Sequence, residues 1–232
     1  MEPKPRFLTI LDSISAVLFV VALGMVFFYA PTERVMGAVQ RVFYFHVATA
    51  WVGMLGFMAA GVAGVAYLRS SDRKWDTVSL AAVEISLVFF FITIIMGSIW
   101  ARPAWGTWWT WEPRLTTATI VELLYAAYLM LRQGIEDPDR RARFGAVYTI
   151  LGFISVPVTF LSIRLYRTIH PTVFGVSSPE AEGEFSMTPS MLQTLIFSVL
   201  TFSVIFSSLL WHRIRLGRLA EKVEQLRLKI AH

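Results

Sequence analysis

Residues 105–116 read WGTWWTWEPRLT, and this stretch joins two apolar runs that each approach the length needed to cross a bilayer, about 20 residues. The tryptophans are not spaced to share one face of a strand, because only alternate residues of a strand point the same way. Together with Glu112 and Arg114 they predict a broad indole surface for a large, flat, apolar ligand that also carries charged groups. The four are Trp105, Trp108, Trp109 and Trp111. The alternative is an aromatic belt at the membrane interface, although a belt usually contributes one or two such residues per span end.

The composition indicates a multi-spanning membrane protein. Of the 232 residues, 56% are hydrophobic and 16% are charged, and the mean hydropathy is +0.59. The chain has no cysteine, which excludes disulfides, thiolate metal sites and covalent haem attachment through a Cys-x-x-Cys-His motif. A net charge of +5 would suit a nucleic-acid partner. The positions of the charges argue for membrane orientation instead, so we expect no nucleic acid.

Six apolar runs are predicted to span the membrane, and all six must be helices because lipid offers no partner to an open backbone. The expected fold class is therefore an all-α integral membrane protein. The expected spans are about 7–30, 47–68, 78–100, 115–131, 146–163 and 190–211. Residues 1–211 then form one six-helix domain with a tryptophan-rich loop at 101–116, and residues 212–232 form a cytoplasmic amphipathic C-terminal helix.

The positive charges predict the orientation of these spans. If the N-terminus is inside, the inner segments hold fifteen Lys and Arg residues and the outer segments hold six, which makes both termini cytoplasmic. The tryptophan-rich loop then faces outward, between outer loops at about 31–46 and 164–189. In the first of these, four apolar residues at helical spacing predict a short amphipathic helix along the interface. They are Val35, Val39, Val42 and Phe43.

The C-terminal segment carries an apolar seam with 3-4 spacing. About two heptads are too few to stand alone as a coiled coil. The seam either contacts a partner subunit or lies on the inner leaflet through its arginines, and the sequence favours neither. Its residues are Leu216, Leu219, Val223, Leu226 and Ile230.

Two of the four histidines, His46 and His170, lie in the outer loops that flank the tryptophan-rich loop. A histidine at a span end is often only an interfacial polar residue, but two that bracket an indole surface can hold haem iron from its two faces. Arginines suit the haem propionates, because a guanidinium pairs with a carboxylate through two hydrogen bonds. Arg41 and Arg114 are the candidates, and positioning against lipid headgroups is the alternative for both.

Three motifs carry a resemblance to a known family: WGTWWTWEPRLT in an outer loop, RVFYFHVATAW entering the second span, and RTIHP before the last. Over nearly its whole length the chain resembles the haem exporter protein C family, CcmC, of the System I cytochrome c maturation pathway. That family usually has Asp where this chain has Glu112. The difference keeps the charge and adds one methylene.

The resemblance implies that haem b binds non-covalently and transiently at the outer surface of the bacterial inner membrane, with His46 and His170 as axial ligands. It implies a platform of Trp105, Trp108, Trp109 and Trp111, with Arg41, Arg114 and Glu112 supporting the propionates or the loop. The implied partners are a CcmE-like periplasmic haem chaperone, CcmA- and CcmB-like ABC transporter subunits, a small CcmD-like single-span subunit and membrane lipid. It implies haem handling and transport rather than enzymatic catalysis, together with assistance to the covalent attachment of haem to the chaperone.

Three other classes of protein share some of these features. A membrane b-type cytochrome would hold haem between histidines within the spans, and no histidine lies in mid-span here. A haem or solute permease would favour interrupted helices and polar groups near the midplane, for which Pro157 and Glu122 are the only hints. The synthetase branch of the same superfamily has more spans and further histidines within the membrane.

Overall fold

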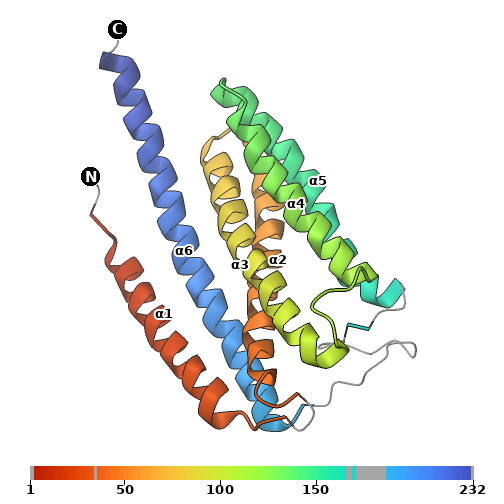
Figure 1. The fold of residues 1–232 in the computed structure, drawn as a ribbon. Coiled ribbons are helices and arrows are strands. Elements are labelled where there is room, and N and C mark those ends of the chain that lie inside the picture. The colour runs from red at the N-terminus through yellow and green to blue at the C-terminus, as the bar shows by residue number, and fades with distance from the viewer. Residues whose placement is uncertain (1–2, 34–35, 166–168, 171–186, 231–232) are drawn as a thin grey trace.

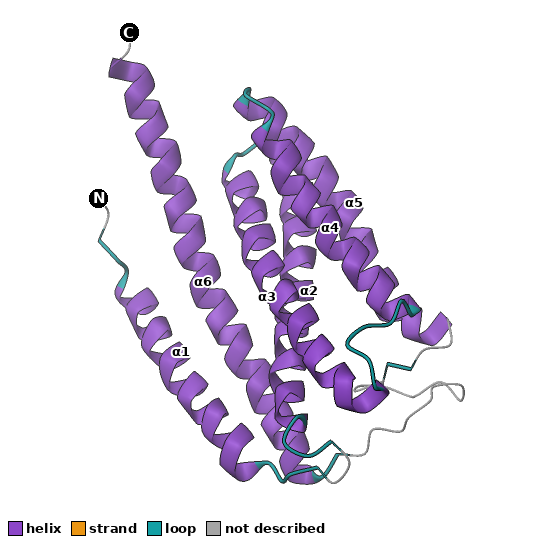
Figure 2. Cartoon of the chain, in the orientation of Figure 1, coloured by secondary structure: helices purple, strands orange, loops and turns teal. Residues whose placement is uncertain are grey.

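The computed structural model describes residues 3–33, 36–165, 169–170 and 187–230. All regular elements in these ranges are helices (Figures 1 and 2). They are α1 (Arg6–Gly24), a π-helical turn η1 (Met25–Tyr29), α2 (Gln40–Ser70), α3 (Lys74–Trp105), α4 (Pro113–Gln133), α5 (Pro138–Leu165) and α6 (Pro189–Ile230). Six helices in the described part of the chain are long and apolar enough to cross a membrane, which confirms the predicted all-α fold class.

The helices form three packed pairs. The α2–α3 pair lies in the middle, the α4–α5 pair packs on one side of it, and α1 and α6 pack together on the other side (Figure 1). Both chain ends lie at one end of the bundle, here called the terminal end. The connection between α3 and α4 lies at the opposite end, here called the loop end, as does the start of α2.

Small residues on α2 bring it close to its neighbours, as expected where helices associate in lipid by close packing. A Cβ atom added at Gly61 would lie 2.7 Å from the Cβ of Phe153 in α5, and one added at Gly64 would lie 2.7 Å from Oγ1 of Thr149. Aromatic rings fill the space between the pairs. Phe57 of α2 stacks on Tyr125 of α4, with ring centroids 4.0 Å apart and an interplanar angle of 7°.

A buried ion pair joins α3 to α4 at the terminal end. Arg132 Nη1 lies 2.7 Å from Oδ1 of Asp76 and Nη2 lies 2.5 Å from Oδ2, a two-pronged pairing of guanidinium and carboxylate. The two side chains are 8% and 7% exposed. In the sequence Arg132 is only one of the fifteen inner Lys and Arg residues, and nothing there reveals that it is buried and paired.

The helices α2 to α6 extend further than the apolar runs do. Residues 40–46 form the first turns of α2 rather than a separate interfacial helix, and Val35 lies outside the described residues. The helix α3 continues through Pro103 to Trp105 and ends at Gly106, whose φ of +74° favours glycine. The tryptophan-rich connection is therefore residues 106–112 instead of 101–116. The C-terminal segment continues α6 without a break.

Candidate functional site

The two outer histidines meet at the loop end of the bundle. His46 lies in the second turn of α2, and His170 lies in the connection between α5 and α6. Their ring centroids are 6.4 Å apart, with an angle of 38° between the ring planes. Residues far apart in the sequence thus present two imidazoles to one another.

Two residues of α3 hold the His46 ring in place. Its Nδ1 lies 3.0 Å from the backbone carbonyl oxygen of Thr93. A carbonyl oxygen only accepts hydrogen bonds, so Nδ1 carries the proton and Nε2 keeps its lone pair. One turn further along α3, Gly97 leaves room for the ring, because a Cβ atom there would lie only 2.8 Å from its Cε1. This is the usual arrangement of a metal-binding histidine, whose second nitrogen is tied to a fixed acceptor.

The histidines lie beside a narrow cavity of about 70 Å³ between the α2–α3 pair and the α4–α5 pair. The α2 and α3 side of the wall includes Met54, Phe90, Ile94 and Trp100, and α4 contributes Leu115 and Ala118. The lining is mostly apolar and aromatic, and Arg114 is the one permanently charged side chain among the described residues of the wall. Such a lining suits an apolar ligand with an anionic group at one edge.

The four tryptophans do not form one surface. Trp105 and Trp109 line the cavity, whereas Trp108 and Trp111 are 57% and 73% exposed. Trp105 meets His170 edge-on, with centroids 6.2 Å apart, and Trp109 meets Trp111 edge-on at 5.7 Å. The structure therefore gives the aromatic stretch an inner pair and an outer pair of indoles.

The charged candidates also separate. Arg114 lines the cavity with the histidines, but the guanidinium of Arg41 lies over the ring of Phe27, 5.4 Å from its centroid, and Arg41 is not part of the cavity wall. Glu112 caps α4, where its Oε1 accepts a hydrogen bond of 2.8 Å from the backbone N–H of Leu115. A shorter Asp is the more usual residue in this capping role, and Glu112 performs it with the longer side chain.

Sequence reasoning missed Thr93, Gly97 and Trp100. Trp100 packs edge-on against Trp105, with centroids 5.7 Å apart, and its Nε1 donates to Oε1 of the buried Gln40 at 3.2 Å. A glycine inside an apolar helix costs stability and usually has a packing reason, so Gly97 was a usable signal. The Thr93 contact uses a backbone carbonyl, which no side-chain pattern reveals.

Within the described ranges, no group of three or more His, Cys, Asp or Glu side chains is gathered to hold a metal ion. Two imidazoles alone make a poor site for a bare ion, which usually takes three or four protein ligands. A porphyrin brings its own four nitrogens and needs only axial ligands. The histidine pair therefore fits a metal that arrives inside a macrocycle.

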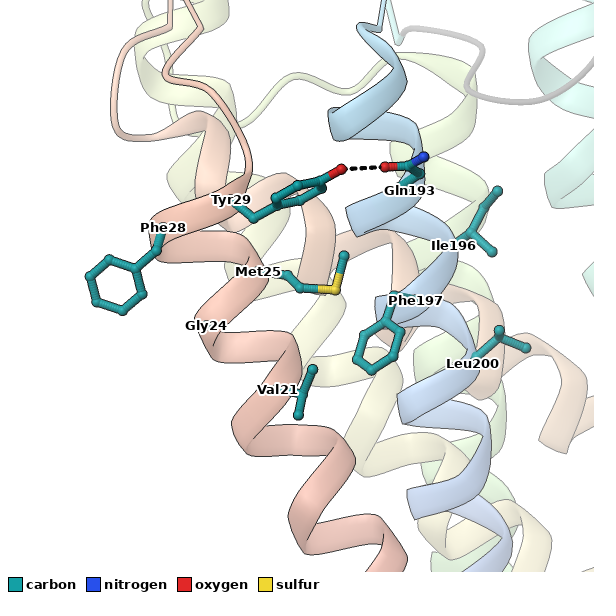
Figure 3. Close-up of a pocket in the computed structure, with 9 residues that line it drawn as sticks. All are labelled: Val21, Gly24, Met25, Phe28, Tyr29, Gln193, Ile196, Phe197 and Leu200. Carbon is teal, nitrogen blue, oxygen red and sulfur yellow. Dashed lines mark hydrogen bonds between the residues drawn. The ribbon is translucent and has the colours of Figure 1, made fainter.

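A larger groove lies between α1 and α6, on the outside of the bundle (Figure 3). Its volume is about 740 Å³, and its wall is almost entirely apolar, including Val21, Met25, Phe28 and Phe197. At one edge the hydroxyl of Tyr29 donates to Oε1 of Gln193 at 2.5 Å. The described residues of its wall include no charged group and no histidine, so the groove carries no comparable argument for haem.

Comparison with known proteins agrees with the three sequence motifs. The family model described as Heme exporter protein C, CcmC, matches residues 2–229. Heme exporter protein C of Bradyrhizobium diazoefficiens is 31% identical over 199 residues, which cover 86% of this chain and 74% of the relative. The protein of the same name from Rhodobacter capsulatus is 30% identical, covering 86% and 81%, and that from Escherichia coli is 27% identical, covering 82% and 74%. The chain belongs to the Heme exporter protein C family.

Proposed function

We propose that this protein binds haem b non-covalently between His46 and His170 and hands it on for the biogenesis of c-type cytochromes. The observation that carries the proposal is the geometry of the two rings. Imidazole nitrogens bind a metal at about 2.0–2.1 Å, so two rings on opposite sides of one iron have centroids about 6 Å apart. The rings of His46 and His170 lie 6.4 Å apart, and the Thr93 carbonyl leaves Nε2 of His46 as the ligand atom.

The remaining site residues take different parts in this proposal. Trp105 and Trp109 pack against the macrocycle, and Arg114 pairs with a propionate. Glu112 fixes the start of α4 and hence the position of Arg114, and Arg41 supports the α1–α2 end of the fold through Phe27. The exposure of the outer pair, Trp108 and Trp111, supports a role in contacting an acceptor protein.

The chemistry of the site is positioning. The described part of the cavity wall presents neither a nucleophile with an orienting base nor an acid–base pair. Two imidazoles hold the iron while the loop end presents one edge of the ring to the next protein. Any covalent step then depends on haem itself and on the acceptor's side chain.

The proposed setting is the bacterial inner membrane, with the loop end facing the periplasm. The excess of positive charge in the segments of the terminal end supports this orientation. The names of the relatives support work beside exporter components. The partners we propose are a CcmE-like haem chaperone as acceptor, CcmA- and CcmB-like transporter subunits and a CcmD-like single-span subunit.

The test is the absorption spectrum of the detergent-purified protein beside the variants His46→Ala and His170→Ala. We expect a six-coordinate haem spectrum that changes in both variants. The matched control is His212→Ala, because His212 lies at the terminal end and contacts Asp12. If haem is present but its spectrum changes in neither His46→Ala nor His170→Ala, the haem site lies elsewhere. That result would favour a b-type cytochrome or a permease.

A further inference from the structure

The C-terminal part of α6 is a preformed helix that continues beyond the length needed to cross a bilayer. At 1.5 Å per residue, the 42 residues of α6 span about 63 Å, whereas the hydrocarbon core of a bilayer is about 30 Å thick. The helix starts at the loop end and runs past the start of α1 at the terminal end (Figure 1). Residues 216–230 therefore continue along a line that leaves the membrane instead of lying along it.

One face of this extension is held by α3. Arg213 forms an ion pair with Glu84, and Oγ1 of Thr77 donates to Oε1 of Glu221 at 2.9 Å. Between them Gly217 lies against Thr77, whose Cγ2 would be 2.6 Å from an added Cβ. These contacts fix the direction of the helix before any partner binds, so a partner would not have to order it.

The apolar seam lies on another face. At 3.6 residues per turn, its centre is about 140° around the helix from the face that contacts α3. All five side chains are exposed: Leu216 58%, Leu219 38%, Val223 42%, Leu226 58% and Ile230 85%. The seam also continues the face on which α1 packs, where Ser208 and His212 contact Asp12. It begins where α1 stops covering that face.

The residues beside the seam show what can cover it. With Leu216, Val223 and Ile230 at heptad position a, the flanking e and g positions are Arg215, Ala220, Lys222, Arg227 and Lys229. Four of the five are basic. If two copies of this helix paired in parallel, Lys222 of one copy would lie beside Arg227 of the other. If they paired antiparallel, basic flanking residues would again lie beside one another. Self-pairing is therefore disfavoured, and a helix flanked by carboxylates is favoured.

We propose that α6 beyond Arg213 is a docking helix for an acidic amphipathic helix of a partner protein. The partner helix lays an apolar face on Leu219, Val223 and Leu226, and its Asp and Glu residues meet the basic flanks. The seam of about two heptads suffices because the α6 side is already folded and anchored on α3.

The test uses the full chain in phosphatidylcholine nanodiscs and two designed three-heptad peptides with the same Leu and Ile seam. One peptide has Glu at every e and g position and the other has Lys. We expect the Glu peptide to bind, measured by fluorescence anisotropy, and the Lys peptide to bind at least about tenfold more weakly. The triple variant Lys222→Glu, Arg227→Glu, Lys229→Glu should reverse this preference, and Leu219→Asp with Leu226→Asp should abolish binding of both peptides. Haem binding, measured in parallel, should match the parent protein in each variant.

Other occupants give different results. Because the chain has no cysteine, Val223→Cys provides a single labelling site. The accessibility of a fluorescent label at this position is measured by quenching with aqueous iodide. If the label is shielded only when phosphatidylglycerol is added to the nanodiscs, the seam binds acidic lipid and the proposal is overturned. A disulfide that forms between Cys side chains of two copies, and that no longer forms when Leu226→Asp is added, would assign the seam to self-association. That result would also overturn the proposal. A water-exposed label together with no binding of the Glu peptide would also refute it.

Discussion

The substitution Gly97→Ala tests whether the packing of α3 positions the haem ligand. An added Cβ would lie 2.8 Å from Cε1 of His46 and 3.2 Å from its Nδ1. Carbon atoms pack best at about 3.5–4.0 Å, so the ring must retreat from α3 by about 0.7 Å. Thr93 lies on the same helix, so this retreat also stretches the 3.0 Å hydrogen bond beyond the usual range. Loss of such an orienting bond usually costs 10- to 100-fold in metal affinity, and we expect haem affinity to fall by about that factor.

The fold should survive this change. Overpacking costs about 1–3 kcal/mol, and the better helix propensity of Ala returns about 1 kcal/mol of it. The assay is a haem titration followed by Soret absorbance, with thermal unfolding followed by circular dichroism on the same samples. Gly24→Ala is the matched control, because Gly24 is also helical but an added Cβ there would meet no atom within 4 Å beyond its own stretch of helix. Parent-like haem affinity in Gly97→Ala would refute the positioning role.

Three further results are expected. Asp76→Asn or Arg132→Met alone should lower the unfolding free energy by about 3–5 kcal/mol, because each leaves a buried charge unpaired. The double variant Asp76→Leu with Arg132→Met should recover part of this loss. Denaturant titration in detergent measures these stabilities, and a double variant less stable than either single variant would contradict the expectation. Glu112→Ala should lower the unfolding free energy by about 1 kcal/mol because it removes the helix cap, whereas Glu112→Asp keeps the cap. Equal thermal midpoints for the parent protein and both variants would argue against a capping role. Trp109→Ala should lower haem retention more than Trp108→Ala, since only Trp109 lines the cavity; equal losses in Soret absorbance would remove the distinction between inner and outer indoles.

The sequence predicted the number of spanning helices well, because apolar length alone determines that property in lipid. It was less informative about where helices end. The helix α2 begins at Gln40 and α3 ends at Trp105, both outside the apolar runs, because polar and aromatic residues near an interface can continue a helix. The true end of α3 is set by Gly106, a signal that was present in the sequence but lies inside the tryptophan motif.

For the candidate site, too, the sequence predicted some features and not others. His46 and His170 were singled out from their places in the sequence, and the structure brings their rings together. Arg41 and Arg114 were both candidates for the propionates, yet only Arg114 lines the cavity, because side-chain direction depends on how α1, α2 and α4 pack. The support from the Thr93 carbonyl depends on the register between α2 and α3 and could not be predicted.

The small size of the cavity has a consequence for how tightly cargo can be held. Its volume is about 70 Å³, whereas sites for organic ligands usually measure about 300–1,000 Å³. In the proposed function, haem therefore enters only after the α4 side moves away from the α2–α3 pair, and α4 packs much more on α5 than on α3. A site that is open one time in a hundred binds about a hundredfold more weakly than a permanently open one. That lower affinity suits a carrier, since the next protein then has to compete only with a weakly binding site.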